Sequence, residues 1–221
     1  TCSAVLEYDK NQQCNILSNI IYSQISEHKD YGGVVPEIAA RSHINNIDVV
    51  VQKSVKDAEI NYSSLNAIAV TSGPGLKGGL LVGVTFAKTM ASILEKPLLG
   101  INHLEGHALT IRMIQKISFP YLLLLVTGGH THILIVKGIG DYERLGTTID
   151  DALGEAYDKT AKSLNLGYPG GPIIEKLAEI GDGSAISFPR PLYNSKEMNF
   201  SFSGLKTAVK QEIDSSLPIN C

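Results

Sequence analysis

The sequence predicts an α/β protein, and three observations support this class. Short apolar segments of strand length alternate with longer segments of helical periodicity. Glycine and proline clusters separate these segments, as turns do. The composition, 43% hydrophobic and 19% charged with a net charge of −3, excludes a disordered tail, a collagen-like fibre and a polycation that coats nucleic acid. Apolar runs such as residues 121–126 fall short of the ~20 residues that span a bilayer, so no membrane span is expected.

The first of two predicted domains covers residues 1–100. Its predicted elements are strands at residues 4–8 and 14–21, a helix at 36–58, a strand at 65–71 and a helix at 82–94. Pro36 suits the first turn of the longer helix, where a missing N–H costs nothing. Apolar residues recur in that helix near the helical period, which predicts a face in the core. They are Ile38, Ile44, Ile47, Val51 and Val55.

The second predicted domain covers residues 101–221 and begins just after a strand at 98–101. Its predicted elements are a helix at 103–116, strands at 121–126 and 133–137, and helices at 151–164, 172–179 and 203–215. The run at 121–126 is almost continuously apolar and lies between Pro120 and a glycine pair. This pattern predicts a strand buried on both faces, paired with the next strand in a β-hairpin.

The most specific motif is the histidine pair His103 and His107. Residues at i and i+4 are neighbours on one helix face, so the two imidazoles can ligate one metal ion. Glu105 lies about 200° round the helix from His103, which excludes the metalloprotease motif, where the glutamate directly follows the first histidine. The alternative is a pair of surface or capping histidines, because catalytic metal sites normally have three protein ligands.

Two glycine-rich turns follow predicted strands. Thr127-Gly128-Gly129 ends the strand at 121–126, and successive N–H groups in such a turn can bind an anion. The alternative is a tight hairpin turn that needs no ligand. The loop at residues 71–79 resembles a phosphate cradle, but it lacks the Gly-Lys-Ser/Thr ending of a P-loop and the spacing of a dinucleotide fingerprint. Its glycines are also explained by close packing of a helix on the sheet.

An acidic segment begins at Asp150. On a helix that starts there, Asp151, Glu155 and Asp158 share one face. Like charges so close destabilise the helix unless a ligand, a cation or lysines such as Lys159 and Lys162 neutralise them. The alternative is an acidic first helical turn, which explains the first two aspartates but not Asp158.

Together these blocks closely resemble the TsaD family, also called YgjD, with eukaryotic OSGEP relatives and formerly labelled glycoproteases. The resemblance extends through further blocks at residues 32–37, 72–75, 102–107, 126–131, 150–159, 168–172 and 199–207. It implies an ASKHA fold, the actin-like and sugar-kinase-like architecture of two α/β lobes about a ligand cleft, with the second lobe incomplete in this chain.

The resemblance also implies an activity. Family members transfer a threonylcarbamoyl group from threonylcarbamoyl-AMP to the adenosine 3′ of the anticodon, in tRNAs that read codons starting with A. It implies accessory subunits that include a non-catalytic paralogue and an ATPase, while the cysteine content predicts the cytoplasm as compartment. His103 and His107 match the family's ligands for one divalent metal ion, iron or zinc. Positions that match its substrate-binding residues are Leu125, Val126, Thr127, Gly128, Gly129, Asp158 and Gly171. No side-chain nucleophile is required.

The chain departs from the family pattern at both ends. Relatives open with a complete first strand and a Cys-Asp-Asp/Glu-Thr loop, whereas Thr1 and Cys2 lead directly into Ser3. Relatives continue beyond residues 199–207 to a ligand-binding Asn and an Asp that completes the metal site, so the third metal ligand is absent here. We therefore expect a gene fragment, a decayed copy or an incomplete chain, of transferase lineage but with its own activity in question, and with exposed apolar surface in its second lobe.

Two other classes of protein share part of this pattern. A small-molecule kinase or actin-like ATPase shares the fold but does not need the histidine pair, and the non-catalytic paralogue lacks that pair. The lysines and arginines are scattered along the sequence without a basic stripe, so tRNA as a partner comes from the resemblance alone. Cys2, Cys14 and Cys221 have neither zinc-site spacing nor an even count for disulfides, which favours a reducing compartment.

Overall fold

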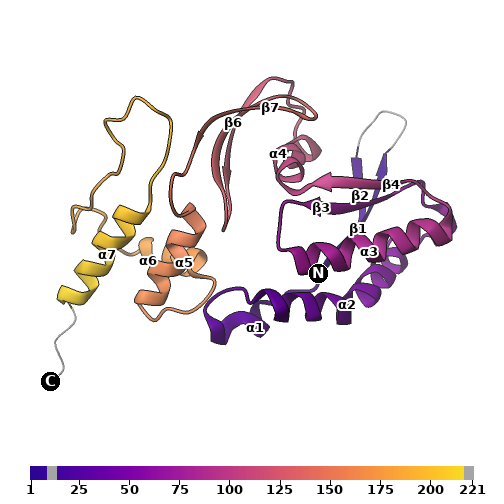
Figure 1. Ribbon diagram of the computed structural model, residues 1–221, viewed down its shortest axis with the longest axis horizontal. Helices are drawn as coiled ribbons and strands as arrows, with labels where there is room; N and C mark the ends of the chain where they lie inside the picture. Colours follow the sequence, from indigo (N-terminus) through magenta and orange to yellow (C-terminus); the bar gives the residue numbers. More distant parts are fainter. Residues whose placement is uncertain (9–13, 217–221) are drawn as a thin grey trace. The chain divides into compact units, whose positions relative to one another are not determined.

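The computed structural model describes residues 1–8 and 14–216, which form two compact units (Figure 1). The first unit contains residues 1–28 and 34–116, and the second contains residues 29–33 and the described part of 117–221. Both units combine helices with strands, so the predicted α/β class is confirmed. Helix α4 (His103–Ile114) belongs by its contacts to the first unit, whereas the sequence placed it in the second domain. The lobe boundary at residue 100 stays a prediction.

The first unit opens with an antiparallel pair, β1 (Cys2–Tyr8) and β2 (Cys14–Ile21), packed on helix α2 (Pro36–Asp57). The buried Ser54 of α2 fixes this packing with hydrogen bonds to both strands. Its Oγ lies 2.7 Å from Ser3 Oγ, and its carbonyl oxygen accepts a 2.6 Å hydrogen bond from Ser18 Oγ. Short helices α1 (Ile25–His28) and η1 (Lys29–Tyr31) lead into α2, and η2 (Tyr62–Ser64) follows it.

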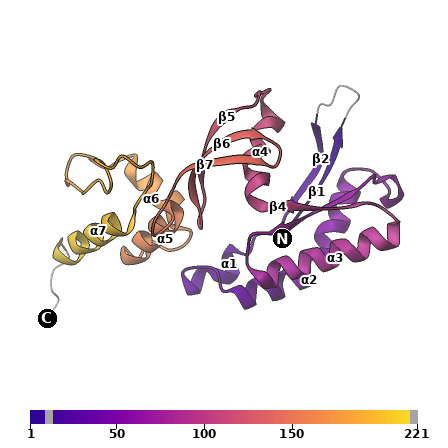
Figure 2. The ribbon, with the colours of Figure 1, turned by 45° about the horizontal axis from the view of Figure 1, so that its top comes forward.

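A parallel pair, β3 (Ile68–Gly73) and β4 (Leu98–Asn102), is connected through helix α3 (Lys77–Leu94) (Figure 2). Helix α3 packs on both β3 and α2. Its predicted start at residue 82 was wrong, because Gly78 and Gly79 lie inside the helix. A Cβ at Gly78 would lie 3.0 Å from Ala40 Cβ of α2, so glycine permits the close approach of the two helices. This contact favours close packing as the explanation for the glycines of residues 71–79, although α3 packs here on helix α2 and the sequence analysis had expected the sheet.

The predicted core face of α2 is only partly buried. Val55 is buried together with Val50, but Ile44 is 60% exposed. Ile44, Ile47 and Val51 instead line a cavity of about 920 Å³ between α2 and α3, so part of the predicted face lies in an open apolar groove.

The second unit contains a three-stranded antiparallel meander of β5 (Tyr121–Val126), β6 (Thr131–Gly138) and β7 (Asp141–Thr147). The hairpin of the first two strands was predicted, but β7 was missed because its polar and charged residues are typical of an edge strand. The prediction that β5 is buried on both faces was wrong. Leu125 is 5% exposed, whereas Leu122 and Leu124 on the other face are 69% and 60% exposed.

Three helices follow the meander: α5 (Leu153–Ser163), α6 (Gly170–Ala178) and α7 (Ser203–Ser216). Helix α5 packs on the other two. The segment before α7 runs beside the end of the meander, because Phe200 N–H donates to Thr147 O at 2.9 Å and Ile149 N–H donates to Phe200 O at 2.9 Å. Helix α5 begins two residues later than predicted, which leaves Asp150 and Asp151 outside it.

Within the described residues, no helix combines the length and the apolar character needed to cross a bilayer. Cys2 and Cys14 are free thiols, and Cys221 lies outside the described part of the chain.

Candidate substrate site

The histidine pair lies at the start of helix α4, where strand β4 ends. Asn102 caps this helix, as its Oδ1 accepts hydrogen bonds from Leu104 N–H at 2.9 Å and Glu105 N–H at 3.3 Å. This cap fixes His103 and His107 one turn apart, with ring centroids 4.5 Å from each other and an interplanar angle of 72°. The two imidazoles are close enough to contact one ion.

The donor set at this position is incomplete for a metal centre. Two neutral imidazoles suit iron or zinc, but a catalytic site normally has three protein ligands. In residues 1–8 and 14–216 no group of three histidine, cysteine, aspartate or glutamate side chains could hold a metal ion. The described residues therefore contain the two histidines that the family resemblance implies as ligands, and their role as ligands stays a prediction.

The glycine turn lies in the second unit, between β5 and β6. Thr127 Oγ1 accepts hydrogen bonds from His130 N–H at 2.9 Å and Gly129 N–H at 3.3 Å, and Thr127 N–H donates to His130 O at 2.8 Å. Three amides, those of Thr127, Gly129 and His130, are thus used to hold the shape of the turn. Among the hydrogen bonds of the described residues, none is donated by Gly128 N–H, and Cβ atoms built at Gly128 and Gly129 would meet nothing within 4 Å.

Helix α5 begins directly against this turn. A Cβ at Gly154 would lie 2.8 Å from Gly128 Cα and 2.8 Å from Thr127 O, so this position admits no side chain. The buried Thr131 adds a hydrogen bond, as its Oγ1 accepts from Leu153 N–H at 2.9 Å. The structure thereby brings the glycine turn and the N-terminus of α5 together.

Asp158 connects α5 to the next helix. Its Oδ1 accepts a 2.7 Å hydrogen bond from Gly170 N–H at the N-terminus of α6. A Cβ at Gly170 would lie 2.8 Å from Tyr157 O, so the two helices approach closely. Gly171 follows in the first turn of α6. One carboxylate oxygen of Asp158 therefore has a structural partner, which the sequence had not indicated.

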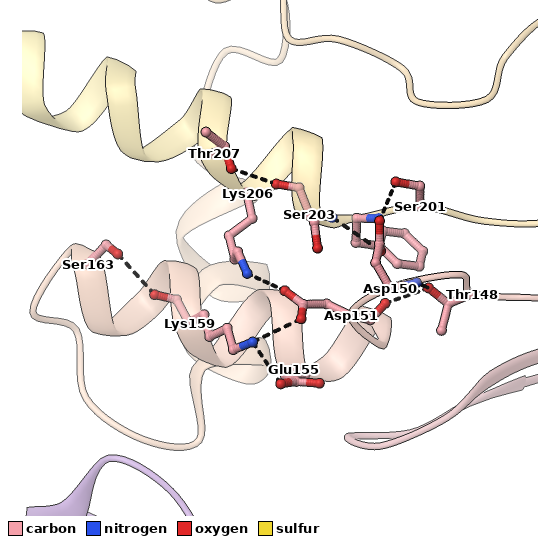
Figure 3. A network of polar contacts seen from close by, with 11 residues as sticks. Thr148, Asp150, Asp151, Glu155, Lys159, Ser163, Ser201, Ser203, Lys206 and Thr207 are labelled. Atoms are coloured by element: carbon pink, nitrogen blue, oxygen red, sulfur yellow. Dashed lines mark hydrogen bonds and ion pairs between the residues drawn. The ribbon is translucent and has the colours of Figure 1, made fainter.

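The predicted three-carboxylate face does not form, because Asp150 and Asp151 precede helix α5 (Figure 3). Asp150 instead binds the N-terminus of α7. Its Oδ1 accepts from Phe202 N–H at 2.8 Å and Ser203 N–H at 3.3 Å, and its Oδ2 accepts from Ser201 Oγ at 2.5 Å. Burial raises the pKa of Asp150, but these hydrogen bonds outweigh burial and leave the pKa below its usual value.

Two lysines neutralise the charge of Asp151. Its two oxygens contact Lys206 Nζ and, at 2.9 Å, Lys159 Nζ, which also contacts Glu155 at 2.7 Å. The hydrogen bonds from Lys206 and then Lys159 hold the pKa of Asp151 below its usual value. The carboxylates of Glu155 and Asp151 in turn raise the pKa of Lys159. Lys159 was among the lysines predicted for this role, whereas Lys206, 55 residues away from Asp151, was not.

The parts described above define the class of protein: an α/β protein that carries an open glycine turn against a helix N-terminus in one unit and a capped histidine pair in the other. The histidine pair belongs to the first unit and the turn to the second. That the two lobes border a ligand cleft stays a prediction from the family resemblance.

Comparison with known proteins identifies the family. The family model described as "TsaD: tRNA N6-adenosine threonylcarbamoyltransferase" matches residues 15–219, so the chain belongs to the TsaD family, as the resemblance predicted. Curated relatives of that name include proteins from Rhizobium etli, 54% identical over 220 residues, and Brucella suis, 55% identical over 219 residues. A third, from Bartonella bacilliformis, is 54% identical over 220 residues.

These matches cover 99–100% of this chain but 60–61% of each relative. The chain therefore spans about three fifths of the length of the curated relatives that it matches. Among solved structures, YeaZ from Pseudomonas aeruginosa aligns with a TM-score of 0.38 and 14% identity, over 65% of this chain and 60% of that chain.

Proposed function

We propose that this protein transfers a threonylcarbamoyl group from threonylcarbamoyl-AMP to the N6 amine of an adenosine in tRNA. The acceptor is the adenosine 3′ of the anticodon in tRNAs that read codons starting with A. The single observation that carries this proposal is the TsaD match over residues 15–219. In the reaction, N6 attacks the carbamoyl carbon and a C–N bond forms. The C–O bond to AMP breaks, N6 loses a proton, and AMP leaves with the bonding electron pair.

We expect the glycine turn to bind the adenylate part of the donor. The open space at Gly128 and Gly129 lets a ligand approach the backbone closely, and Gly128 N–H supplies a donor for an anionic oxygen. Thr127 keeps the turn in this shape through its two accepted hydrogen bonds. Leu125 and Val126 complete the predicted contact at the end of β5.

Asp158 and Gly171 are proposed to bind the ribose side of the donor. Asp158 Oδ1 holds Gly170, so Oδ2 is the oxygen that we expect to accept from a ribose hydroxyl. Gly171 N–H lies in the first turn of α6, where backbone donors favour acceptor oxygens. Both roles are positioning roles, which suits a reaction in which orientation of two substrates supplies much of the rate.

His103 and His107 are proposed to hold one divalent metal ion, iron or zinc, together with a third ligand outside the described residues. When bound, such an ion supplies Lewis-acid polarisation of carbamoyl or phosphate oxygens. His107→Ala should therefore lower the metal content of the purified protein, measured by elemental mass spectrometry after dialysis. Glu105→Gln is the control and should keep the metal, since Glu105 lies on another side of the helix. Full metal content in His107→Ala would exclude this role.

The proposed partners are tRNA and accessory subunits that include a non-catalytic paralogue and an ATPase. A membrane is not among the proposed partners. The proposed compartment is the cytoplasm. The partners rest on the family resemblance, and the compartment rests on the cysteine content.

The test is a transfer assay with threonylcarbamoyl-AMP, an unmodified tRNA transcript and the accessory subunits of a bacterial relative. Mass spectrometry of the digested tRNA should detect threonylcarbamoyladenosine only when the chain is present. Gly128→Ala should lower the rate about 10- to 100-fold, because its Cβ enters the ligand space and displaces the donor. ATP hydrolysis without tRNA, and no modified nucleoside, would favour a kinase-like function instead.

A further inference from the structure

Four lysines that are scattered in the sequence line one cavity of about 570 Å³ between α5 and α7. Lys159 and Lys162 lie one turn apart on α5, and Lys206 and Lys210 lie one turn apart on α7. The sequence showed no basic stripe, because the two lysine pairs are more than 40 positions apart and only the packing of α5 on α7 brings them together. The remaining lining residues are Ser163 and Thr207.

Two of these lysines are held in place by carboxylates. Lys159 contacts Asp151 and Glu155, and Lys206 contacts Asp151, so both ammonium groups are fixed beside the cavity (Figure 3). Lys206 is also the more buried of the two, with 28% of its side chain exposed against 43% for Lys159. Fixed charges of this kind lose little conformational entropy when an anion binds.

The other two lysines leave an excess of positive charge. Within the described residues, Lys162 and Lys210 form no salt bridge, and both are exposed. Four lysines against the two contacting carboxylates leave a net charge of about +2 around one cavity. Ser163 and Thr207 donate their hydroxyl hydrogens to the carbonyl oxygens of Lys159 and Ser203. The available donors are therefore ammonium groups, which act as point charges toward phosphate.

We propose that this lysine cavity binds phosphate groups, and that these belong to the backbone of the RNA substrate. The charge excess matches polyphosphate chemistry, and the volume exceeds what a single water or small ion needs. The identity of the RNA as tRNA rests on the proposed function. A free phosphate compound is the other source of the same chemistry, and the experiment distinguishes the two.

The test measures the affinity of the purified chain for a fluorescein-labelled, unmodified tRNA transcript by anisotropy at several KCl concentrations. Lys162→Ala combined with Lys210→Ala should weaken binding about 5- to 20-fold near 0.1 M salt and reduce the salt slope by about 1.4–1.8, since each phosphate contact contributes about 0.7–0.9. The matched control, Lys176→Ala with Lys196→Ala, removes the same charge from elsewhere in the second unit and should change the affinity less than about twofold.

Circular dichroism checks that the double variant is folded, and Lys162→Gln with Lys210→Gln replaces it if the alanine variant is not. Competition with AMP and with inorganic pyrophosphate then separates the two sources. Weak competition together with loss of RNA binding supports the RNA backbone. Strong competition that the double variant abolishes supports a free phosphate compound and overturns the assignment to RNA. Equal RNA affinity in the double variant and the control, or no RNA binding by the unaltered chain, overturns the proposal.

Together with the binding measurement, the transfer assay distinguishes failure of the lysine site from failure of the proposed function. Transfer by the unaltered chain with no effect of the lysine substitutions on RNA binding would contradict the lysine site alone. Loss of RNA binding in the double variant, without any transfer by the unaltered chain, would contradict the function alone.

Discussion

Asp150 and Asp151 are adjacent in sequence, but each binds a different part of α7. Asp150 accepts from the backbone at the start of the helix, and Asp151 contacts Lys206 one turn further on. Both aspartates lie before α5, where the sequence had placed them within the helix. The pair therefore holds a helix that begins more than 50 residues later in the chain.

Asp150→Ala should destabilise the second unit by about 1–2 kcal/mol, the usual cost of losing a side chain that caps a helix N-terminus. The Phe202 and Ser203 N–H groups lose their acceptor in this variant. Urea denaturation followed by circular dichroism measures the change. Asp214→Ala, at an exposed position on α7, is the control. Equal midpoints for the two variants would show that Asp150 has no capping role.

The stability contributed by Asp151 should depend on pH. Its pKa is lowered by Lys206 and Lys159 from the usual value of about 3.9. A lowered carboxyl pKa contributes stability that is fully present above the unfolded-state value and is lost as the pH falls through the folded-state value. The difference in urea midpoint between the unaltered chain and Asp151→Asn should thus be constant from about pH 5 to 8 and shrink below about pH 4. A difference that grows in acid would contradict this ion pair.

Among the elements of the second unit, two glycines near the same turn should differ in how much an alanine substitution costs. Gly154→Ala should lower stability by about 1–3 kcal/mol, because its Cβ would overlap Gly128 and the Thr127 carbonyl. Gly128→Ala should stay within about 0.5 kcal/mol of the unaltered chain, since its Cβ enters open space. Thermal unfolding of both variants, with Gly183→Ala as an open-loop control, checks the contrast. A stable Gly154→Ala protein would show that α5 does not pack on the turn as described.

The sequence predicted most elements because their apolar periodicity is strong. The helix at α2 and the strand β5 were placed within a residue or two, and the start of α4 was correct because Asn102 caps it. The strand β7 was missed because Arg144 and two acidic residues hide its weak alternation. The early start of α3 was missed because glycines normally disfavour helix, and only the approach of α2 explains them here.

The site was predicted unevenly for a related reason. The histidine pair and the glycine turn are local motifs, so their residues were found from spacing and resemblance. The partners Lys206 and Ser201 of the acidic pair, and the lysine cavity, depend on the packing of α7 near α5. Contacts between residues 50 positions apart leave no periodic signal in one sequence.

At the scale of the molecule, exposed apolar surface should limit solubility, as the sequence analysis expected for the second lobe. Leu122 and Leu124 of β5 are 69% and 60% exposed on one face of the meander. Leu122→Thr combined with Leu124→Thr should raise the soluble fraction and delay aggregation, because a smaller apolar patch remains while β propensity is kept. Light scattering during a temperature ramp measures this. Faster aggregation of the variant would show that this face is covered in solution.

The most direct test of the central claim is to observe where threonylcarbamoyl-AMP binds, by titrating it into ¹⁵N-labelled chain and recording amide spectra. The amide signals of Gly128 and Gly129 should shift in proportion to occupancy, with Gly171 following and the amide of Gly183 unchanged. Saturable binding that leaves the glycine turn unperturbed, or no binding at all, would contradict binding of the donor at this turn.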